Sequence, residues 1–559
     1  MEETLRKAIA EALAAAGAPD TAFVVEWPAT LAHGDYATNA AMAAAKALGK
    51  NPRELADELV LALRTTLTHQ VSSIEVAGPG FINFTLARPV ISGIVKEVAE
   101  LGSGWGRGSA AEGKRVSIEY SNPNAFKEMH IGHLMGSIVG ESVSRLIENS
   151  GATVIRDTFG GDIGPNVAKC LWALQNKGVT DVASAAEIGA AYIQGANAYE
   201  ESEAAKAEID ALNTRIYDVV ARQDEELTDE ERMLLALWRK GREVSMEEFR
   251  RIWKTVDTHF DYEFFDSDTG DSGIRIVRDG LGKGVFKESD GAVIYDGEEK
   301  GVHTMVFITS RGTPTYEAKD IGLAFLREEK IPNDTVIIVT GNEQTGRFRT
   351  VLAALEEIAP RIAEKTRHIA TGFLTLTTGK MASRKGNIIT ASELITDVIG
   401  RASEKNPDPL IAEAVAIGAI KYMILRSAPG ANIIFDPVKS LSLEGDSGPY
   451  LQYALVRARS VLAQAGEGER DTGAPEEVYD LERVIIRFPE VAALACAEEA
   501  PHKVAQYLTQ LAGEWNSFYA KERIIGGEYE GYKLALARAF AMTMENGLRL
   551  LAIPTPERM

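Results

Sequence analysis

The first hundred residues carry apolar positions at two different spacings, which predicts a small domain of helices and strands. Apolar positions three and four apart indicate a helix, whereas strict alternation indicates a strand half buried against a core. Four glycines between 102 and 108 then indicate a linker. We therefore predict an α+β domain over residues 1–105. Its expected elements are a helix with Leu5, Ile9 and Leu13 on one face, an alanine-rich helix over about 36–48, a helix after Pro52, and a strand within Gly78–Leu86.

The next segment has a strand–helix–strand order. Arg115–Tyr120 and Thr153–Phe159 have the pattern of strands. Between them, the apolar residues of Ile131–Asn149 fall on one helical face, and Gly151 is placed to end that helix. This order is a βαβ unit, whose two strands lie parallel in one sheet. We therefore predict an α/β domain with a parallel sheet over residues 106–405.

The rest of the chain predicts an insertion into this domain and a helical end. Residues near 176–258 are rich in Ala, Glu and Arg at helical spacing, so we expect a helical insertion there. Nearly everything from about 408 onward has helical period, which predicts an all-α domain over 406–559. Further strands are expected at Gly291–Tyr295, Thr304–Thr309, Thr335–Val339 and His368–Leu376.

Composition narrows the class of protein. The 559 residues include only two cysteines, Cys170 and Cys496, which lie far apart, so we expect neither a disulfide framework nor a zinc site. The start of the chain lacks a basic segment followed by an apolar run, and no stretch approaches the ~18 apolar residues of a membrane span. We therefore predict a cytoplasmic protein. The net charge of −21 argues against a non-specific nucleic-acid binder but leaves room for local basic patches.

The turn His130-Ile131-Gly132-His133 lies at the carboxyl end of a predicted strand, where open α/β sheets bind ligands. Free backbone N–H groups at the start of the next helix favour an anion, and Gly132 lets a flat base or a phosphate approach closely. Two imidazoles three residues apart could donate hydrogen bonds to a phosphate as charge builds on it. Two unrelated histidines at a helix cap are the simpler interpretation of the turn alone. The strand and the helix around the turn favour a nucleotide site. A metal site is less well supported, because no third ligand lies near the two histidines.

A second candidate is the basic segment Lys380–Asn387, which follows an apolar strand and carries three cations in six residues. A basic loop that ends in glycine suits a mobile clamp over pyrophosphate, whose charge rises as it leaves. An exposed basic loop without such a role is an equally good interpretation of the segment by itself.

Together the two motifs resemble the HIGH and KMSKS signatures of class I aminoacyl-tRNA synthetases, whose order and wide separation they share. Lys380 and Met381 match the second signature, but Ser383 stands at its second lysine and Lys385 follows two residues later. Arginyl-tRNA synthetases often carry such a loop, together with a lysine just before HIGH that is suggested to substitute. Lys127 stands at that place. The sequence leaves open whether Lys127 or Lys385 compensates for Ser383.

The resemblance to arginyl-tRNA synthetases extends over nearly the whole chain. It implies a Rossmann-like catalytic domain with a helical insertion, an N-terminal domain that contacts tRNA, and a C-terminal helical domain that binds the anticodon. The stretches that carry it are Ser121–Leu134, Leu443–Tyr453 with its Gly-Pro-Tyr-Leu-Gln-Tyr run, His33–Asn39 and Pro556–Met559.

The resemblance also implies a pocket for arginine. A guanidinium is planar, always charged and rich in donors, so its pocket needs carboxylates and neutral acceptors. Tyr316 and Asp320 lie four apart, on one face if helical, and match the family's tyrosine and aspartate of that pocket. Without the resemblance they would be a structural pair. Asn124 and Gln344 also match family substrate contacts, and Asp266 stands where the family usually has glutamate. Asp266 is either a direct or water-bridged contact to the substrate amino group, or a turn cap.

The roles of two further sets of residues remain open. Asp162 either orients a substrate-binding group or caps the next helix. In the C-terminal region, aromatic and basic residues interleave, which suits stacking on splayed anticodon bases but is also ordinary for packed helices. From the resemblance we expect tRNA contacts at Asn39, Tyr450, Gln452, Arg457 and Met559.

The resemblance implies an arginine–tRNA ligase that uses ATP with Mg²⁺ and acts, we expect, as a monomer. Its catalytic residues would be Lys127, His130, His133, Lys380 and Lys385, and ATP would also contact Gly132, Met381 and Arg384. Two rivals stay open. One is a class I synthetase for lysine or cysteine, although two isolated cysteines cannot supply the zinc ligands of the cysteine enzyme. The other is an inactive, tRNA-binding or regulatory paralogue, which Ser383 and Asp266 motivate and the intact His130, His133, Lys127 and Asp320 argue against.

Overall fold

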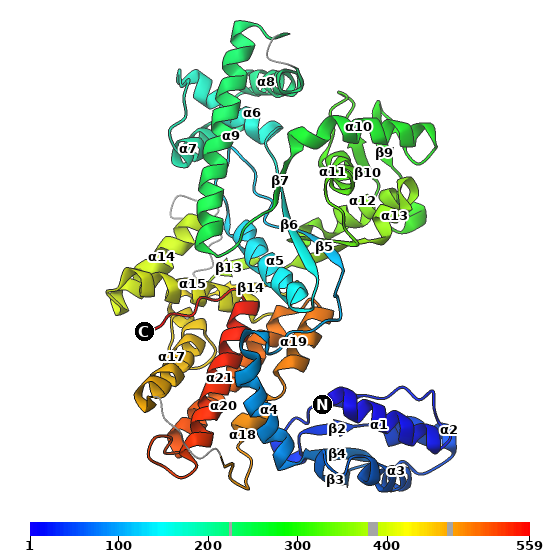
Figure 1. The fold of residues 1–559 in the computed structure, drawn as a ribbon. Coiled ribbons are helices and arrows are strands. Elements are labelled where there is room, and N and C mark those ends of the chain that lie inside the picture. The colour runs from blue at the N-terminus through cyan, green and yellow to red at the C-terminus, as the bar shows by residue number, and fades with distance from the viewer. Residues whose placement is uncertain (223–225, 378–388, 467–472) are drawn as a thin grey trace.

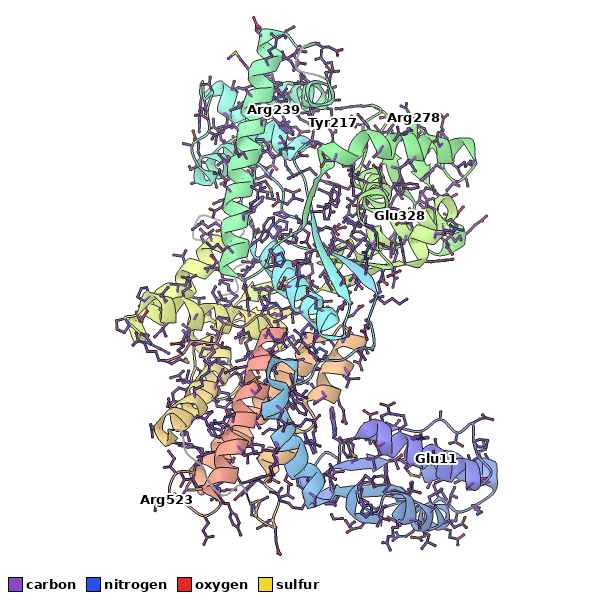
Figure 2. The ribbon with its side chains drawn as sticks, viewed as in Figure 1. Glu11, Tyr217, Arg239, Arg278, Glu328 and Arg523 are labelled. Atoms are coloured by element: carbon purple, nitrogen blue, oxygen red, sulfur yellow. The ribbon has the colours of Figure 1, made fainter. Side chains whose placement is uncertain are left out.

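The computed structural model describes residues 1–222, 226–377, 389–466 and 473–559. Figure 1 shows an elongated molecule, with the N-terminal unit and the C-terminal helices at one end, the helices from α6 (Pro165–Asn176) to α9 (Asp229–Thr255) at the other, and the parallel sheet between them. Charged side chains such as Glu11, Arg278 and Arg523 project from its outer faces (Figure 2). Among the described residues, no helix is both long and apolar enough to cross a membrane.

The N-terminal unit is an antiparallel sheet of order β1-β2-β4-β3 against three helices. The prediction of one helix over 36–48 is wrong at its start. Tyr36–Thr38 is a short strand that pairs with Phe84–Ile82, and the helix begins only at Ala40. The elements are α1 (Glu2–Ala15), β1 (Val25–Glu26), the 3₁₀ turn η1 (Leu31–His33), β2 (Tyr36–Thr38), α2 (Ala40–Leu48), α3 (Pro52–Thr66), β3 (Val71–Ala77) and β4 (Phe81–Leu86).

The chain then runs through α4 (Arg88–Leu101) and the turn η2 (Gly102–Gly104), and α4 packs on the C-terminal helix α21 (Glu530–Leu550). A five-stranded, wholly parallel sheet follows, of order β12-β11-β5-β6-β7. The predicted βαβ unit is present, and its helix spans Ile131–Asn149 as expected. The sheet elements are β5 (Arg115–Glu119), α5 (Ile131–Asn149), β6 (Thr153–Gly160), β7 (Tyr262–Phe265), β11 (Thr335–Gly341) and β12 (Thr366–Thr371).

The strand order places a topological switch point between β5 and β11. From β5 the chain winds outward through β6 to β7, and then returns to β11 on the other side of β5. The loops that leave the carboxyl ends of β5 and β11 therefore diverge to opposite faces of the sheet. Such a divergence opens the crevice in which doubly wound sheets bind ligands.

The helical insertion lies between β6 and β7 (Figure 1). Tyr217 of its third helix lies on the side of the insertion that faces the helices after β7 (Figure 2). The Tyr217 ring lies 5.6 Å from Nζ of Lys319. Its helices are α6 (Pro165–Asn176), α7 (Ala185–Glu201), α8 (Glu203–Ala221) and α9 (Asp229–Thr255).

Two helices and a small antiparallel sheet, β10-β9-β8, stand between β7 and β11. The expected strands near 291–309 belong to this separate sheet. The elements from β7 to β12 are α10 (Asp266–Gly282), β8 (Lys287–Ser289), β9 (Ala292–Tyr295), η4 (Glu298–Lys300), β10 (Met305–Ile308), α11 (Tyr316–Lys330), η5 (Asn342–Gln344), α12 (Thr345–Ile358) and α13 (Pro360–Glu364).

The expected single strand His368–Leu376 is two strands in two sheets. β12 ends at Thr371, and β13 (Leu374–Leu376) pairs instead with β14 (Ile433–Phe435). Between them, Gly372 approaches the chain so closely that a Cβ would lie 1.9 Å from the carbonyl oxygen of Ala431. This contact between distant segments bends the chain away from the parallel sheet.

The C-terminal part is helical, as predicted, apart from β14. Its helices share one continuous apolar core with α5 and the parallel sheet, so α5 is buried on nearly all sides. The helices are α14 (Ala391–Lys405), α15 (Pro409–Leu425), α16 (Pro437–Ser440), α17 (Gly448–Ala465), α18 (Asp480–Ile485), α19 (Phe488–Ala497), α20 (Pro501–Lys521) and α21.

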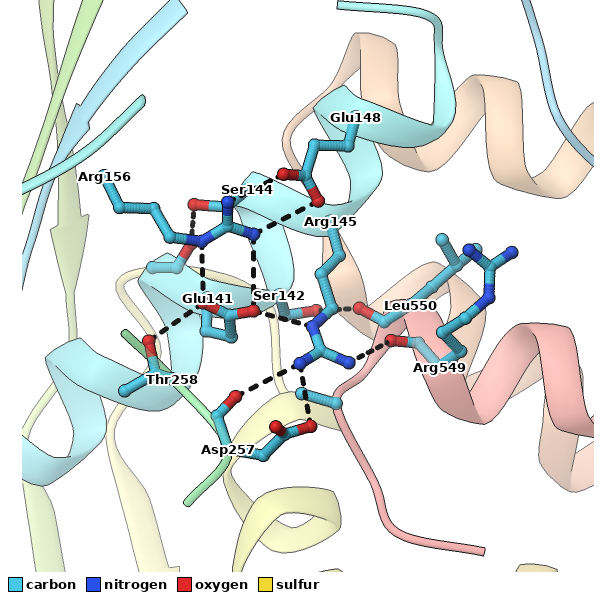
Figure 3. A network of polar contacts seen from close by, with 12 residues as sticks. Glu141, Ser142, Ser144, Arg145, Glu148, Arg156, Asp257, Thr258, Arg549 and Leu550 are labelled. Atoms are coloured by element: carbon cyan, nitrogen blue, oxygen red, sulfur yellow. Dashed lines mark hydrogen bonds and ion pairs between the residues drawn. The ribbon is translucent and has the colours of Figure 1, made fainter. Parts of the chain in front are cut away.

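Polar contacts join α5 to the end of α21 (Figure 3). Arg145 donates to Glu141 of its own helix, to Asp257 and to the carbonyl oxygen of Arg549. Arg156 of β6 pairs with Glu141 as well. Because Glu141, Arg145 and Arg156 are each paired with an opposite charge and hydrogen-bonded, their pairing offsets the cost of burying them beside α5.

Candidate functional site

A cavity of about 430 Å³ lies at the switch point. Its walls come from the loop after β5, the first turn of α5, the ends of β6 and β11, and the starts of α10, α11 and α12. Eight of the residues predicted from the sequence lie in its lining: Asn124, His130, Gly132, His133, Asp266, Tyr316, Asp320 and Gln344. The fold therefore brings the predicted phosphate-binding turn and the predicted arginine pocket into one site.

His130 is the N-cap of α5, and its Nδ1 accepts a hydrogen bond from the Gly132 N–H at 3.0 Å. The ring proton consequently resides on Nε2, which makes Nε2 a donor. The His130 and His133 rings stack with centroids 3.6 Å apart. Burial, reinforced by the charge of Lys127, lowers the pKa of His130 to about 4. Burial also holds the pKa of His133 well below its ordinary value, so both imidazoles are neutral at pH 7.

The expectation of free backbone N–H groups at the start of α5 is wrong. The N–H of Ile131 donates to Ile389, that of Gly132 to the His130 ring, and that of His133 to the His130 carbonyl oxygen. The His130 side chain folds back over the turn, where a Cβ on Gly132 would lie 2.9 Å from its Cε1. Hydrogen-bond donation to an anion therefore falls to the imidazoles rather than to the backbone.

Tyr316 and Asp320 lie one turn apart at the start of α11, as the sequence predicts. Glycines set this helix against α10, because a Cβ on Gly273 would lie 2.1 Å from the Ala318 carbonyl oxygen and one on Gly322 would lie 2.3 Å from that of Thr269. The close approach brings the acids of both helices to the same cavity. Only 9% of the Asp320 side chain is exposed, and burial raises its pKa to about 7.

Two cations that pair with the acids of the cavity were not predicted, Arg347 in its lining and Lys319 behind it. Arg347 Nη1 lies 2.9 Å from Asp320 Oδ2, and Lys319 Nζ donates to Asp266 Oδ2 at 2.8 Å. The sequence offered a signal for both residues, since Lys319 stands beside Asp320 and Arg347 stands one turn after Gln344. Pairing across helices depends on tertiary packing, which no local pattern in the sequence encodes. Burial raises the pKa of Asp266 to about 6, although the charge of Lys319 opposes this.

Asp162 caps a helix, but not the next one along the chain. Its carboxylate accepts from the N–H and the hydroxyl of Ser267 at 2.9 and 2.7 Å, and it pairs with Arg242. It therefore fixes the first turn of α10, which begins at Asp266. The alternative that Asp162 caps the next helix is therefore wrong, and the turn that it holds instead carries Asp266, a carboxylate of the cavity.

Lys127 lies beside the pocket, outside the cavity lining. Its Nζ is 5.4 Å from the ring centroid of Tyr192 in the insertion, and burial, with the charge of Lys169, lowers its pKa. Its charge is close enough to the imidazoles to depress the pKa of both. The predicted residues Lys380, Met381, Arg384 and Lys385, together with Ser383, lie outside the described residues.

The residues predicted to contact tRNA divide into surface and interior positions. The Arg457 guanidinium lies 4.3 Å from the ring centroid of Tyr519 and 5.6 Å from that of Tyr453, and both tyrosines are more than a third exposed. Arg457 also donates to Asn516, which in turn donates to the hydroxyl of Tyr450. These side chains form a polar aromatic surface on α17 and α20, and the partly exposed Met559 lies at the end of the chain.

Gln452 and Asn39 have structural contacts instead. Gln452 is fully buried, and its amide donates to the carbonyl oxygens of Ala414 and Pro554, so it has no surface for direct contact with RNA. This corrects the expectation for Gln452, which faces inward on the same helix as Tyr453. Asn39 is partly exposed, and its Oδ1 accepts from the Val24 N–H.

Three family models match the chain in order. One described as "tRNA synthetases class I (R), catalytic domain" matches residues 100–437. A model of the arginyl tRNA synthetase N terminal domain matches residues 3–86, and one of the DALR anticodon binding domain matches residues 451–559. The three matches together cover most of the chain.

Curated relatives and solved structures agree with these matches. An arginine–tRNA ligase of Ligilactobacillus salivarius is 30% identical over 552 residues, which cover 96% of this chain and 95% of the relative. One of Treponema denticola is 29% identical, with 92% and 91% covered. The arginyl-tRNA synthetase of Thermus thermophilus superposes over both whole chains with a TM-score of 0.77 at 26% identity. That of Plasmodium falciparum shares the fold, with a TM-score of 0.81 at 19% identity and 100% and 99% covered.

Proposed function

This chain belongs to the arginyl-tRNA synthetase family and is an arginine–tRNA ligase, and we propose how its pocket carries out that reaction. The arginine carboxylate attacks the α-phosphate of ATP, which gives arginyl-adenylate and pyrophosphate. The 3′-terminal ribose hydroxyl of tRNA(Arg) then takes the arginyl group and releases AMP. The observation that carries this proposal is a single cavity that holds both the His130–His133 turn and the carboxylates of Asp266 and Asp320.

ATP would lie against the first turn of α5. Nε2–H of His130 and the ring of His133 would donate to the α-phosphate as negative charge grows there, and neutral imidazoles can do so without a change of protonation. Gly132 would contact the nucleotide through its backbone, because the His130 ring occupies the space that a side chain at this position would fill. Lys127 would add a positive charge on the same side. The loop residues Lys380, Met381, Arg384 and Lys385 belong to the same proposal, as contacts to ATP and the departing pyrophosphate.

Mg²⁺ would accompany ATP, held chiefly by phosphate oxygens. Within the part of the chain that the structure describes, no group of three His, Cys, Asp or Glu side chains is placed to hold a metal ion. The ion would therefore enter with the nucleotide and would offset the charge of the phosphates.

Arginine would lie deeper in the same cavity. Asp320 would accept two parallel N–H groups of the guanidinium, the geometry in which charge-assisted bonds are strongest, with Tyr316 and Gln344 alongside. Asp266 and Asn124 would face the amino group. Asn124 is set by a tight contact, since a Cβ on Gly161 would lie 2.1 Å from its Oδ1. This order directs the substrate carboxylate toward the α5 turn.

The tRNA would extend from this cavity along the C-terminal helices. The aromatic surface of Tyr450, Tyr453, Arg457 and Tyr519 offers faces on which splayed anticodon bases can stack. The N-terminal unit, near Asn39, would contact another part of the tRNA. Because the whole chain is acidic, binding depends on such local patches and weakens with salt. We also propose that the protein acts as a monomer of 60.5 kDa.

Charging of tRNA with each amino acid tests the proposal. Arginine, ATP and tRNA(Arg) should give arginyl-tRNA, and pyrophosphate exchange should depend on arginine and tRNA. Strong exchange with lysine, and none with arginine plus tRNA, would overturn the arginine assignment. A wild-type protein that charges no tRNA with any amino acid would instead support an inactive paralogue.

A further inference from the structure

The carboxylate proposed to bind the substrate already faces a guanidinium of the protein itself. Arg347 comes from the first turn of α12, and its Nη1 lies 2.9 Å from Oδ2 of Asp320. The same guanidinium lies 5.9 Å from the ring centroid of Tyr316, and all three side chains line the cavity. An arginine side chain of the protein thus shares the Tyr316–Asp320 subsite proposed for the side chain of a bound arginine.

We propose that Arg347 is an internal stand-in for the substrate, which neutralises Asp320 in the empty pocket and is displaced when arginine binds. The inference rests on the proposed function, because it takes Asp320 as the guanidinium site. Arg347 would then be a residue that determines specificity. An amino acid that enters the pocket must interact with Asp320 more favourably than Arg347 already does.

The existing ion pair leaves hydrogen bonds unmade. Oδ2 of Asp320 is buried and, among the described residues, accepts no hydrogen bond, and Nε of Arg347 has no acceptor there either. The two charges are close without the alignment of a bidentate pair. A free arginine that presents two parallel N–H groups to Asp320 would make the bonds that Arg347 does not. A lysine ammonium, which is a point charge, cannot match this geometry and would displace Arg347 poorly.

The second carboxylate of the pocket provides a contrast. Lys319 and Asp266 are each only 4% exposed at the side chain, and their 2.8 Å contact is a well-formed hydrogen bond. The Arg347 side chain is 20% exposed and lies on the cavity wall, with its guanidinium 4.8 Å from the Phe348 ring centroid. Lys319 is therefore enclosed and fixed, whereas Arg347 can swing toward the open cavity without uncovering a buried charge of its own.

The surroundings of Asp320 explain why the empty pocket needs a cation. Burial raises the pKa of Asp320, the charge of Arg347 on α12 lowers it, and three acids raise it. These acids are Glu119 on β5, Glu317 on α11 and Asp266 on α10. Without Arg347, the carboxyl group would therefore take up a proton at a higher pH and would lose its charge for the substrate.

Binding of arginine and of lysine to the full-length chain tests the proposal, by calorimetry between pH 6 and pH 9. The variants are Arg347→Gln, Arg347→Lys, which keeps a cation, and Arg349→Gln, an exposed arginine on the same helix as matched control. Thermal unfolding checks that each variant is folded. At pH 9, above the pKa of about 7 that burial gives Asp320, Arg347→Gln should bind arginine about five- to tenfold more tightly, because no competitor occupies Asp320.

Two further results are expected from Arg347→Gln. Its discrimination against lysine should fall, and the pH below which arginine affinity is lost should rise, while Arg347→Lys and Arg349→Gln should keep the wild-type pH midpoint. Weaker arginine binding at pH 9 with an unchanged midpoint would overturn the inference. Charging of tRNA by the wild type separates the two proposals. An inactive wild type contradicts the proposed function, whereas an active wild type with unaltered binding by Arg347→Gln contradicts the stand-in alone.

Discussion

His130 and His133 show how single residues acquire their chemistry from the fold. An exposed histidine titrates near pH 6.5, but burial and the charge of Lys127 hold both imidazoles neutral at the pH of a cell. The hydrogen bond from the Gly132 N–H then selects the tautomer of His130 with its proton on Nε2. A pair of neutral donors faces the site where negative charge is expected to grow.

At this scale we predict that His130→Ala lowers the rate of arginine-dependent pyrophosphate exchange about 10²-fold, because one donor to the transition state is lost. His130→Asn, which keeps a neutral donor, should lose less. The wild-type rate should show no inflection from an imidazole near pH 6.5. His69→Ala, at an exposed position of the N-terminal unit, serves as control. An inflection near pH 6.5 that vanishes in His130→Asn would contradict the account.

Single elements place the acids of the pocket. Helix α10 begins at Asp266, and Asp162 holds that first turn by accepting from the N–H and hydroxyl of Ser267. Asp162 is itself fully buried. Removal of its carboxylate leaves the partly buried N–H of Ser267 without its acceptor and Arg242 without its partner.

Asp162→Ala should therefore lower the free energy of unfolding by about 2–4 kcal/mol. It should also raise the KM for arginine, since the turn that carries Asp266 loosens. Urea unfolding and charging kinetics measure the two effects. Asn51→Ala removes the N-cap of α3, in the N-terminal unit, and should lower stability without a change in KM. An arginine KM in Asp162→Ala equal to that of the wild type would show that Asp162 only stabilises the fold.

The helix Ile131–Asn149 and the parallel pairing were predictable because the information is local, in a clear period and a glycine with φ of +96° just after the helix. The start of α2 was not, because Tyr36–Thr38 becomes a strand only by pairing with β1 and with β4, and β4 lies more than forty residues away. Arg347 and Lys319 were not predicted for a related reason, since the carboxylates with which they pair lie on other helices. Gln452 was misplaced because aromatic and basic neighbours on a helix do not reveal which side faces inward.

At the scale of the whole molecule, one apolar core joins the catalytic domain to the C-terminal helices. It runs from the parallel sheet through α5 into those helices. A buried charge lies in this region. Lys421 of α15 is 1% exposed and donates to the carbonyl oxygen of Ala552, just after α21. Burial, with the nearby Arg145, lowers its pKa to about 7.

Lys421 should therefore make stability depend on pH. Between pH 7 and about 10, the unfolded chain keeps the proton on this lysine while the folded protein releases it, so the free energy of unfolding rises with pH. Relative to Lys421→Met, the wild type should gain about 2–4 kcal/mol across this window. Urea unfolding at several pH values measures the gain. Lys96→Met, an exposed control, should show no such difference, and parallel curves for the wild type and Lys421→Met would refute the prediction.

The central claim is that the carboxylate of Asp320 selects arginine for transfer to tRNA. The most direct test is the kcat/KM for arginine in charging of tRNA(Arg) by Asp320→Asn, with Glu328→Gln as an exposed acid control on the same helix. Loss of a charge-assisted bidentate contact should lower kcat/KM by about 10²-fold or more in Asp320→Asn, and Glu328→Gln should match the wild type. A folded Asp320→Asn variant that charges tRNA with arginine as efficiently as the wild type would contradict the account.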